Sequence, residues 1–173
     1  MKKLILSFFV SGALFACTNT EKKSTEVTEQ APTKLSHIYN PTYTDNFKIG
    51  GEENVLLAEQ FHKAGFEKDF AKLENMIADT AVFYNEDGST LKGKTAIVEY
   101  MKNAFSEMTF KNYSIGAIIP VVGENGHQWV DIWDEAEVVT KDGKSQKYQW
   151  VDAFRFEGGK IVVFLGYGKA IKE

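Results

Sequence analysis

The amino-acid sequence predicts an α+β domain, in which helices come first along the chain and antiparallel strands follow. Two observations lead to this prediction. Three segments between residues 50 and 105 space their apolar residues as one face of a helix requires. Four later segments alternate in polarity and are separated by the Gly-containing turns "GENG", "KDGK" and "EGGK". We expect one domain over residues 46–173, since that length suits a single hydrophobic core.

Helix start and stop signals give the boundaries of three predicted helices. The three helices are expected at residues 50–65, 67–79 and 94–105. The first begins with acidic residues, which suit a helix N-terminus, and stops at Gly65. Thr95 is expected to cap the third helix. Between the second and third helices, "AVFYNEDGST" predicts a short strand and a turn.

The first sixteen residues have the pattern of a secretory signal peptide. Lys2 and Lys3 precede an apolar run that is too short to span a bilayer comfortably. The run ends in "LFAC", which resembles the lipobox of bacterial lipoproteins. This resemblance implies that residues 1–16 are removed and that Cys17 carries a lipid. The alternative is an ordinary signal peptide followed by a cysteine without lipid. Cys17 is the only cysteine, so no intramolecular disulfide is expected.

A polar tether is expected over residues 17–45, because Thr, Glu, Lys and Ser dominate its first half and cannot form a core. Removing Lys2 and Lys3 from the 20 basic residues leaves 18 against 24 acidic ones. This balance argues against nucleic acid as a partner, which needs a basic surface. Anionic lipid would not attract the domain either, so the lipid on Cys17 is expected to provide the membrane attachment. The expected location is the cell envelope, on the periplasmic side or at the outer-membrane surface.

The hairpin at "TKDGKS" predicts which side chains share a face. Asp-Gly favours a two-residue turn, and that register places Trp133 opposite Asp152. One face would then combine aromatic and acidic side chains: Trp129, Asp131, Trp133, Glu135, Trp150, Asp152, Phe154 and Phe156, with Tyr167 from the last strand. Carboxylates among aromatic rings indicate a pocket in which water or a ligand satisfies them. The opposite face would be apolar and available for a homodimer through Val130, Ile132, Val138 and Val151.

The segments "MIADTAVFYNEDG", "LKGKTAIVEYM" and "VDAFRFEGGKIV" resemble the NTF2-like superfamily, which includes the SnoaL-like cyclases and ketosteroid isomerase. The resemblance covers essentially the whole domain after the tether. It implies a cone, in which a curved antiparallel sheet wraps around the N-terminal helices and leaves a central pocket. It also implies dimerisation through the sheet, as in many members. With "YTDNFKIG" before the first helix, the chain is similar to exported proteins of Bacteroidetes-type bacteria.

The isomerase chemistry cannot be carried over residue by residue. Ketosteroid isomerase uses an aspartate base, a tyrosine donor and a second aspartate that stays protonated. The resemblance places Asp152 at the protonated aspartate, Phe61 at the tyrosine and Asn85 at the base. Phenylalanine cannot donate a hydrogen bond, and asparagine cannot take up a proton. Two of the three functional groups are therefore missing.

Two functional classes remain open. The first, which the incomplete catalytic set favours, is a lipid-anchored module that binds a small apolar or aromatic ligand. The second is a SnoaL-like lyase, isomerase or cyclase that uses Asp152 with His62 or a tyrosine. Pocket residues are expected to be Phe61, Tyr84, Asn85, Trp129, Asp131, Trp133, Trp150, Phe154 and Tyr167. The position of His62 relative to Asp152 discriminates between the classes, since a shared ligand space would favour the enzyme.

No cofactor or bound metal is expected. The histidines at positions 37, 62 and 127 lack the spacing of zinc ligands. The Gly-rich segments "GENG" and "EGGK" are hairpin turns rather than the phosphate-binding start of a helix.

Overall fold

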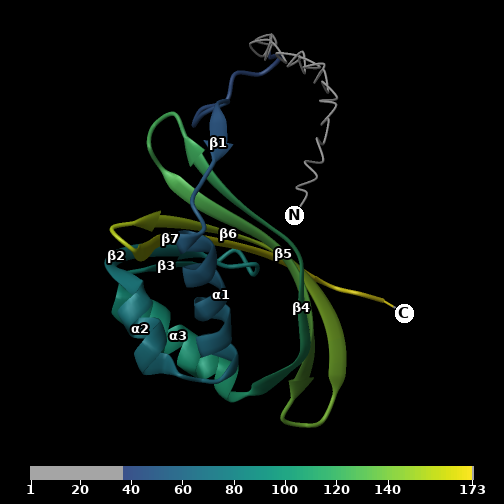
Figure 1. Ribbon diagram of the computed structural model, residues 1–173. Coiled ribbons are helices and arrows are strands. Elements are labelled where there is room, and N and C mark those ends of the chain that lie inside the picture. The colour runs from purple at the N-terminus through teal and green to yellow at the C-terminus, as the bar shows by residue number, and fades with distance from the viewer. Residues whose placement is uncertain (1–36, 173) are drawn as a thin grey trace, which may run out of the picture. The chain divides into compact units, whose positions relative to one another are not determined.

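A computed structural model describes residues 37–172 (Figure 1). Cys17, the signal peptide and most of the expected tether lie outside the described residues. Asn40–Glu173 forms a compact unit. Within residues 37–172, no helix has both the length and the apolar character needed to cross a membrane.

The architecture confirms the predicted α+β cone. The helices are α1 (Glu53–Phe66), α2 (Phe70–Met76) and α3 (Lys94–Ser106). The strands are β1 (Phe47–Ile49), β2 (Ile77–Tyr84), β3 (Thr90–Lys92), β4 (Met108–Gly123), β5 (Gln128–Thr140), β6 (Ser145–Glu157) and β7 (Lys160–Ala170). They form one sheet in the order β1-β4-β5-β6-β7-β2-β3. The β2–β7 pair is parallel, so the sheet is mixed rather than wholly antiparallel.

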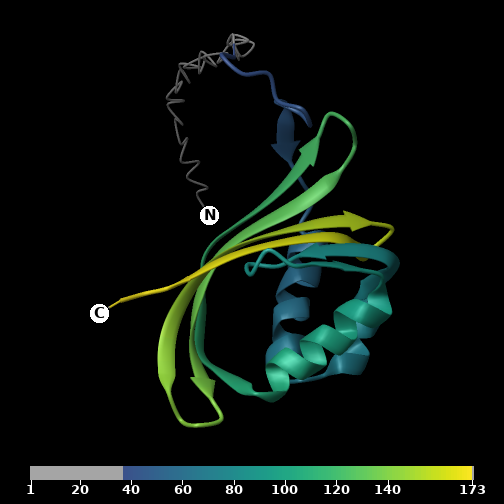
Figure 2. The ribbon, with the colours of Figure 1, turned by 180° about the vertical axis from the view of Figure 1, so that it is seen from behind.

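The curved sheet bends around the three helices, which lie on its inner face (Figure 2). The core between them includes Ala58 and Phe61 of α1, Leu73 of α2, Ile97 of α3, and Phe154 of β6. Phe154 is fully buried and is the largest such side chain among the described residues. The inner face of α1 therefore lies against the middle of the sheet, where a polar side chain of that helix would meet β5 and β6.

Helix α3 begins differently from the prediction. Its N-cap residue is Gly93, which has a φ of 84°, and no side chain caps the helix. Thr95 lies one residue inside the helix, so the expected Thr95 cap is wrong. Gly93 suits this start because a residue with a side chain rarely adopts a positive φ.

The β5–β6 hairpin corrects the expected register by one residue. The Thr140 N–H donates to the carbonyl of residue 144 at 3.0 Å, so the loop holds three residues rather than two. Gly143 provides the left-handed conformation, with a φ of 80°, that such a loop needs. Ile132, not Trp133, therefore pairs with Asp152. Because successive side chains point to opposite faces, this shift moves every β5 side chain to the other face of the sheet.

A bulge has a similar effect on β7. The turn pairs Glu157 with Lys160, as expected for two turn residues, but the register shifts between Arg155 and Phe156. The residues of β7 that pair with Phe154, Asp152 and Trp150 are Phe164, Gly166 and Gly168. Tyr167 pairs with Val151 instead and is 65% exposed.

These two shifts overturn the surface that was expected to form a dimer. Val130, Ile132 and Val138 belong to the interior and are at most 9% exposed, so they are not available to a partner. The outer face carries Val151 and Trp133, each 39% exposed. The shifted β5 register is the physical reason why the aliphatic β5 side chains face inward and Trp133 faces outward. The dimer itself stays a prediction.

Candidate active site

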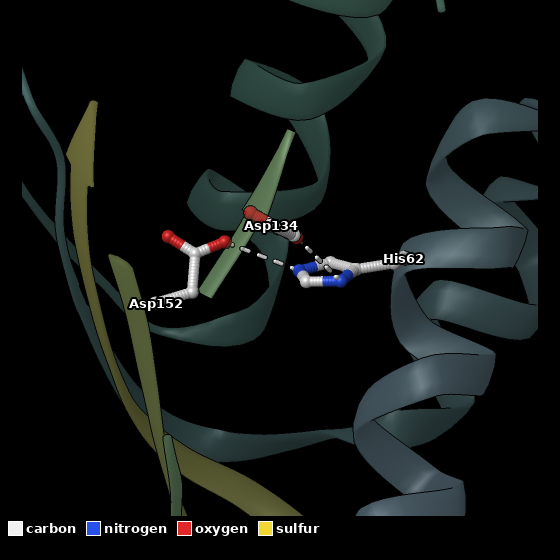
Figure 3. A group of neighbouring side chains, drawn as sticks. All are labelled: His62, Asp134 and Asp152. Carbon is white, nitrogen blue, oxygen red and sulfur yellow. Dashed lines mark hydrogen bonds and ion pairs between the residues drawn. The ribbon is translucent and has the colours of Figure 1, made fainter. Parts of the chain in front are cut away.

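A chain of hydrogen bonds connects four side chains across the inner face of the sheet. His62 projects from α1 toward Asp134 of β5 and Asp152 of β6 (Figure 3). The Nε2 atom of His62 lies 3.2 Å from Oδ2 of Asp152, and its Nδ1 atom lies 2.7 Å from the Tyr113 hydroxyl oxygen. The Tyr113 hydroxyl donates to Oδ2 of Asp134 at 2.8 Å. We call these four residues, Asp152, His62, Tyr113 and Asp134, the relay.

The relay defines where protons can lie. Because the Tyr113 hydroxyl gives its single proton to Asp134, its oxygen accepts from His62, and Nδ1 carries a proton. The hydrogen bond between Nε2 and Asp152 then requires one further proton, which belongs to one of these two atoms. His62 can therefore exchange a proton at Nε2 while its Nδ1 contact fixes the orientation of the ring.

Two phenylalanines hold the imidazole in place. The Phe66 ring stacks on the His62 ring at 5.9 Å between centroids and an angle of 20°. The Phe154 ring meets it edge-on at 5.3 Å and 65°. His62 is only 8% exposed, so its orientation is set by aromatic packing as well as by hydrogen bonds.

A β-bulge brings Tyr113 into the relay. The β4–β5 register shifts between Lys111 and Ser114, so that Asn112 and Tyr113 together oppose one residue of β5. Asn112 has a φ of 52°, and asparagine tolerates this left-handed conformation better than most residues. The Nδ2 group of Asn112 also donates to Glu137 at 3.0 Å. Bulges commonly redirect a side chain near an active site, and this one turns Tyr113 toward His62.

Asp134 is the most strongly perturbed acid of the relay. It is 4% exposed, and burial raises its pKa to about 6. The negative charge of Asp152 adds to this increase, whereas His62 and the Tyr113 hydrogen bond oppose it. Its Oδ1 atom is buried without a hydrogen-bond partner among the described residues. Burial and the charge of Asp134 also raise the pKa of Tyr113, so the phenol remains a proton donor.

The relay lies at the wall of a cavity of about 340 Å³. Its polar lining includes His62, Asp134, Asp152, Asn85 and Glu86. Aromatic rings provide much of the remaining wall: Phe61, Phe66, Phe83, Tyr100, Phe105, Phe110, Tyr148, Trp150 and Phe164. A mostly apolar cavity with a few convergent polar groups is typical of a small-molecule site.

Two glycines of β7 leave room beside the acids. A Cβ atom at Gly166 would lie 3.4 Å from Oδ1 of Asp152 and 2.9 Å from the Phe164 ring. A Cβ atom at Gly168 would lie 2.1 Å from Oε2 of Glu86 and 2.4 Å from the Trp150 ring. Glu86 and Trp150 therefore meet directly over Gly168, at a point where any side chain on β7 would displace them.

The expected site residues divide into two groups. The structure brings Phe61, His62, Asn85, Trp150 and Asp152 together at the cavity. Phe154 lies behind the cavity wall, packed against His62. The remaining residues are absent from the cavity lining: Tyr84, Trp129, Asp131, Trp133 and Tyr167. The shifted register of β5 and the bulge at Val162 of β7 put the last four on the outer face.

Sequence reasoning missed Asp134, Tyr113 and Glu86. A signal for Asp134 was present, because it is the one acid in the otherwise aliphatic alternation of residues 130–138. That alternation is the more hydrophobic of the two on β5, and a core strand normally turns such a face inward. Tyr113 had no such signal, since it reaches the relay only through the bulge.

His62, Asp134 and Asp152 also form a group that could bind a metal ion, with ligand atoms within 4.8 Å of one another. The two carboxylates approach different nitrogens of the same imidazole ring. One ion cannot use both nitrogens of one ring, so a metal would require the ring or a carboxylate to move. The observed arrangement fits proton transfer more directly than ion binding.

Comparisons with known proteins agree with this fold. A family model described as a SnoaL-like domain matches residues 58–164. An LEH-like epoxide hydrolase of M. tuberculosis is 18% identical, with a TM-score of 0.54 over 68% of this chain and 83% of that one. A Catenulispora acidiphila protein with a ketosteroid isomerase-like fold, solved in complex with trimethylamine, is 15% identical, with a TM-score of 0.52 over 64% and 83% of the two chains. An NTF2-like protein of Mesorhizobium loti is 21% identical, with a TM-score of 0.50 over 68% and 92%. A comparison with curated proteins finds no match.

Proposed function

This chain belongs to the family of SnoaL-like domains, and from this membership we propose that it is an acid–base enzyme acting on a small, largely apolar molecule in its cavity. The observation that carries the proposal is the position of His62. Its Nε2 atom is 3.2 Å from Asp152, and both residues line the same ligand space. The reaction classes that fit are those of a lyase, an isomerase or a cyclase, in which a proton moves to or from carbon or oxygen.

Each member of the relay has a role in this proposal. His62 and Asp152 exchange the catalytic proton, because their shared hydrogen bond is the only one of the relay that does not have a fixed donor. Tyr113 and Asp134 keep the imidazole oriented and stabilise it when it is positively charged. The aromatic wall excludes water and contacts the apolar body of the substrate.

A binding module is the second candidate. The observation in its favour is that Phe61 and Asn85, which the resemblance places at two ketosteroid isomerase groups, both line the cavity and cannot perform those roles. Binding alone does not explain why three titratable side chains, each under 9% exposed, are buried in contact, because burying such groups costs free energy. The enzyme therefore has the stronger support.

A general proton-abstraction probe tests the proposal. 5-Nitrobenzisoxazole is a flat aromatic molecule whose ring opens, with a change in absorbance, when a base removes its C–H proton. We expect the domain to accelerate this reaction above buffer, and His62→Gln to reduce that acceleration about 100-fold, the lower end of the usual range for a general base. Tyr167→Phe, an outer-face change on a 65% exposed residue, is the matched control and should retain the wild-type rate. Equal rates for wild type and His62→Gln would contradict the proposal.

We also propose that the mature protein is attached to the membrane of the cell envelope through lipid on Cys17. The support is the order of lysines, apolar run and "LFAC" in the sequence. Stable attachment needs more than one acyl chain. We expect Cys17→Ser to move the protein from the membrane fraction to the soluble fraction, whereas Thr18→Ser should not. Mass spectrometry of the mature N-terminus checks the modification, and an unlipidated Cys17 in the wild-type protein would argue against it.

A homodimer through the outer face of the sheet is a further part of this proposal. Trp133, Val151 and Tyr167 form a row across β5, β6 and β7 and are between 39% and 65% exposed. The three helices of the described residues 37–172 lie on the inner face of the sheet (Figure 2), opposite the face that carries this row. Light scattering of the domain at high micromolar concentration checks the assembly, and a monomer there would rule the dimer out.

A further inference from the structure

The charged groups that line the cavity are strongly biased toward acids. Asp134 and Asp152 belong to the relay, and Glu86 lies near Trp150 beside Gly168. No lysine or arginine is among the lining residues that the structure describes. An organic anion, such as a carboxylate or a phosphate ester, would therefore meet repulsion without a compensating cation. A cation would meet attraction.

The part of the cavity around Glu86 has the features of an aromatic cation site. Tyr148 and Trp150 stack at 5.6 Å with an angle of 14°, and Trp150 meets the Glu86 carboxylate over Gly168. Tyr100 lines the same cavity, and its pKa is raised by burial and by the negative charges of Asp87 and Glu86. Rings beside a carboxylate attract a positive organic head through both the charge and the faces of the rings.

Asp134, which pairs with Trp150 across β5 and β6, supplies a second, independent observation beside this site. Asp134 is 4% exposed, and its Oδ1 atom has no hydrogen-bond partner among the described residues. A buried carboxylate oxygen without a donor is costly, and positive charge in the neighbouring cavity would stabilise its ionised form. The carboxylates of Glu86 and Asp134 thus favour the same kind of molecule, one that carries positive charge.

Resting on the proposed function, we infer that the substrate is an organic ammonium compound whose positive head lies between Glu86, Trp150 and Tyr148. Its uncharged part extends along the aromatic wall toward His62 and Asp152, where the proton is exchanged. The relay provides the chemistry in this arrangement. Glu86, Trp150 and Tyr148 select for a positively charged substrate.

Two isosteric probes separate charge from shape. Choline carries a quaternary ammonium group, and 3,3-dimethylbutan-1-ol has the same outline with carbon in place of nitrogen. Binding is followed by the indole N–H signals in NMR spectra of the ¹⁵N-labelled domain. Trp150 lines the cavity, whereas Trp129 and Trp133 are absent from its lining and serve as internal controls. We expect choline to shift the Trp150 signal alone and to bind at least tenfold more tightly than the neutral alcohol.

A charge-neutralising pair of variants locates the head group. Glu86→Gln is expected to weaken choline binding at least fivefold and to leave binding of the alcohol unchanged. Glu99→Gln removes an equal charge from an exposed residue of α3 that does not line the cavity, and it should match the wild type. Both positions are exposed, so neither change threatens the fold.

Several outcomes would overturn the inference. These are equal affinity for both probes, no binding of either probe, or equal choline affinity in the wild type and Glu86→Gln. Tight binding of Zn²⁺ at His62, with choline excluded, would point to a metal site instead. The result is separable from the proposed function: His62→Gln should lose proton abstraction but retain choline binding. Choline binding without any proton abstraction would contradict the enzyme and leave the ammonium site standing.

Discussion

Ile132→Glu is expected to abolish folding at neutral pH, whereas Val151→Glu should leave the melting temperature within a few degrees of wild type. Ile132 is fully buried against the helices, and Val151 is 39% exposed on the opposite face. The glutamate at position 132 would lose the burial of an isoleucine and place an unpaired charge in the core. The loss of burial alone costs roughly 2–5 kcal/mol. Together with the buried charge, this approaches the total stability of about 5–15 kcal/mol for a typical domain.

Together, the variants Ile132→Glu and Val151→Glu test the register between β5 and β6 directly. A two-residue β5–β6 turn would put both side chains on one surface, and the two variants would then behave alike. Thermal unfolding followed by circular dichroism compares them under the same conditions. A cooperative transition for Ile132→Glu near the wild-type temperature would mean that the three-residue loop at Gly143 is not the one formed. Light scattering of Val151→Glu adds information, since a charge in the row with Trp133 should weaken the proposed dimer.

Asp134→Asn is expected to stabilise the domain at pH 8 by roughly 3 kcal/mol and to have little effect at pH 4. Burial raises the pKa of Asp134 to about 6 in the folded state, from 3.8 for an unperturbed aspartate. Between these two values the folded protein keeps a proton that the unfolded chain has lost. The unfolded state thus binds fewer protons, and wild-type stability falls as the pH rises through this window. Asparagine has no proton to lose and can still accept the Tyr113 hydrogen bond, so the variant avoids this loss.

Chemical denaturation at pH 4, 6 and 8 measures the effect. Glu135→Gln is the matched control, because Glu135 is the next residue on β5, points to the opposite face and pairs with Lys147 at 2.7 Å. It should not reproduce the pH-dependent gain. A variant Asp134→Asn that is less stable than the wild type at pH 8 would show that the carboxylate is paired more strongly than its burial suggests.

The order and type of the main elements could be predicted from the sequence. The helical spacing of apolar residues and the alternation in the later strands are local signals, and the turns at Gly143 and Gly159 mark where strands end. Strand β1 had no comparable signal, because it is three residues long and exposed. The side of the sheet on which each β5 residue lies depended on one turn residue, which a dipeptide preference does not determine.

The candidate site could likewise be predicted only in part from local sequence signals. Asp152 and Trp150 were placed correctly because β6 presents them on the same face in either register. Asp134 was missed because the register was shifted, and Trp133 was expected in the cavity for the same reason. Tyr113 depends on the bulge at Asn112, a tertiary feature with no sequence period. His62 could be named as a candidate base, but its partners lie 51 and 90 residues away along the chain.

Gly166 and Gly168 affect the space that is available to a ligand, whereas other residues provide the proton-transfer groups. Neither residue carries a functional group, yet each faces a member of the site: Gly166 pairs with Asp152, and Gly168 pairs with Trp150. A side chain added at Gly166 would narrow the cavity from the β7 side, whereas one at Gly168 would displace Glu86 and Trp150. Neither change removes an acid or the imidazole of the relay. Substrate size in this scaffold can therefore be redesigned on one strand while the proton-transfer groups on α1, β4, β5 and β6 are left untouched.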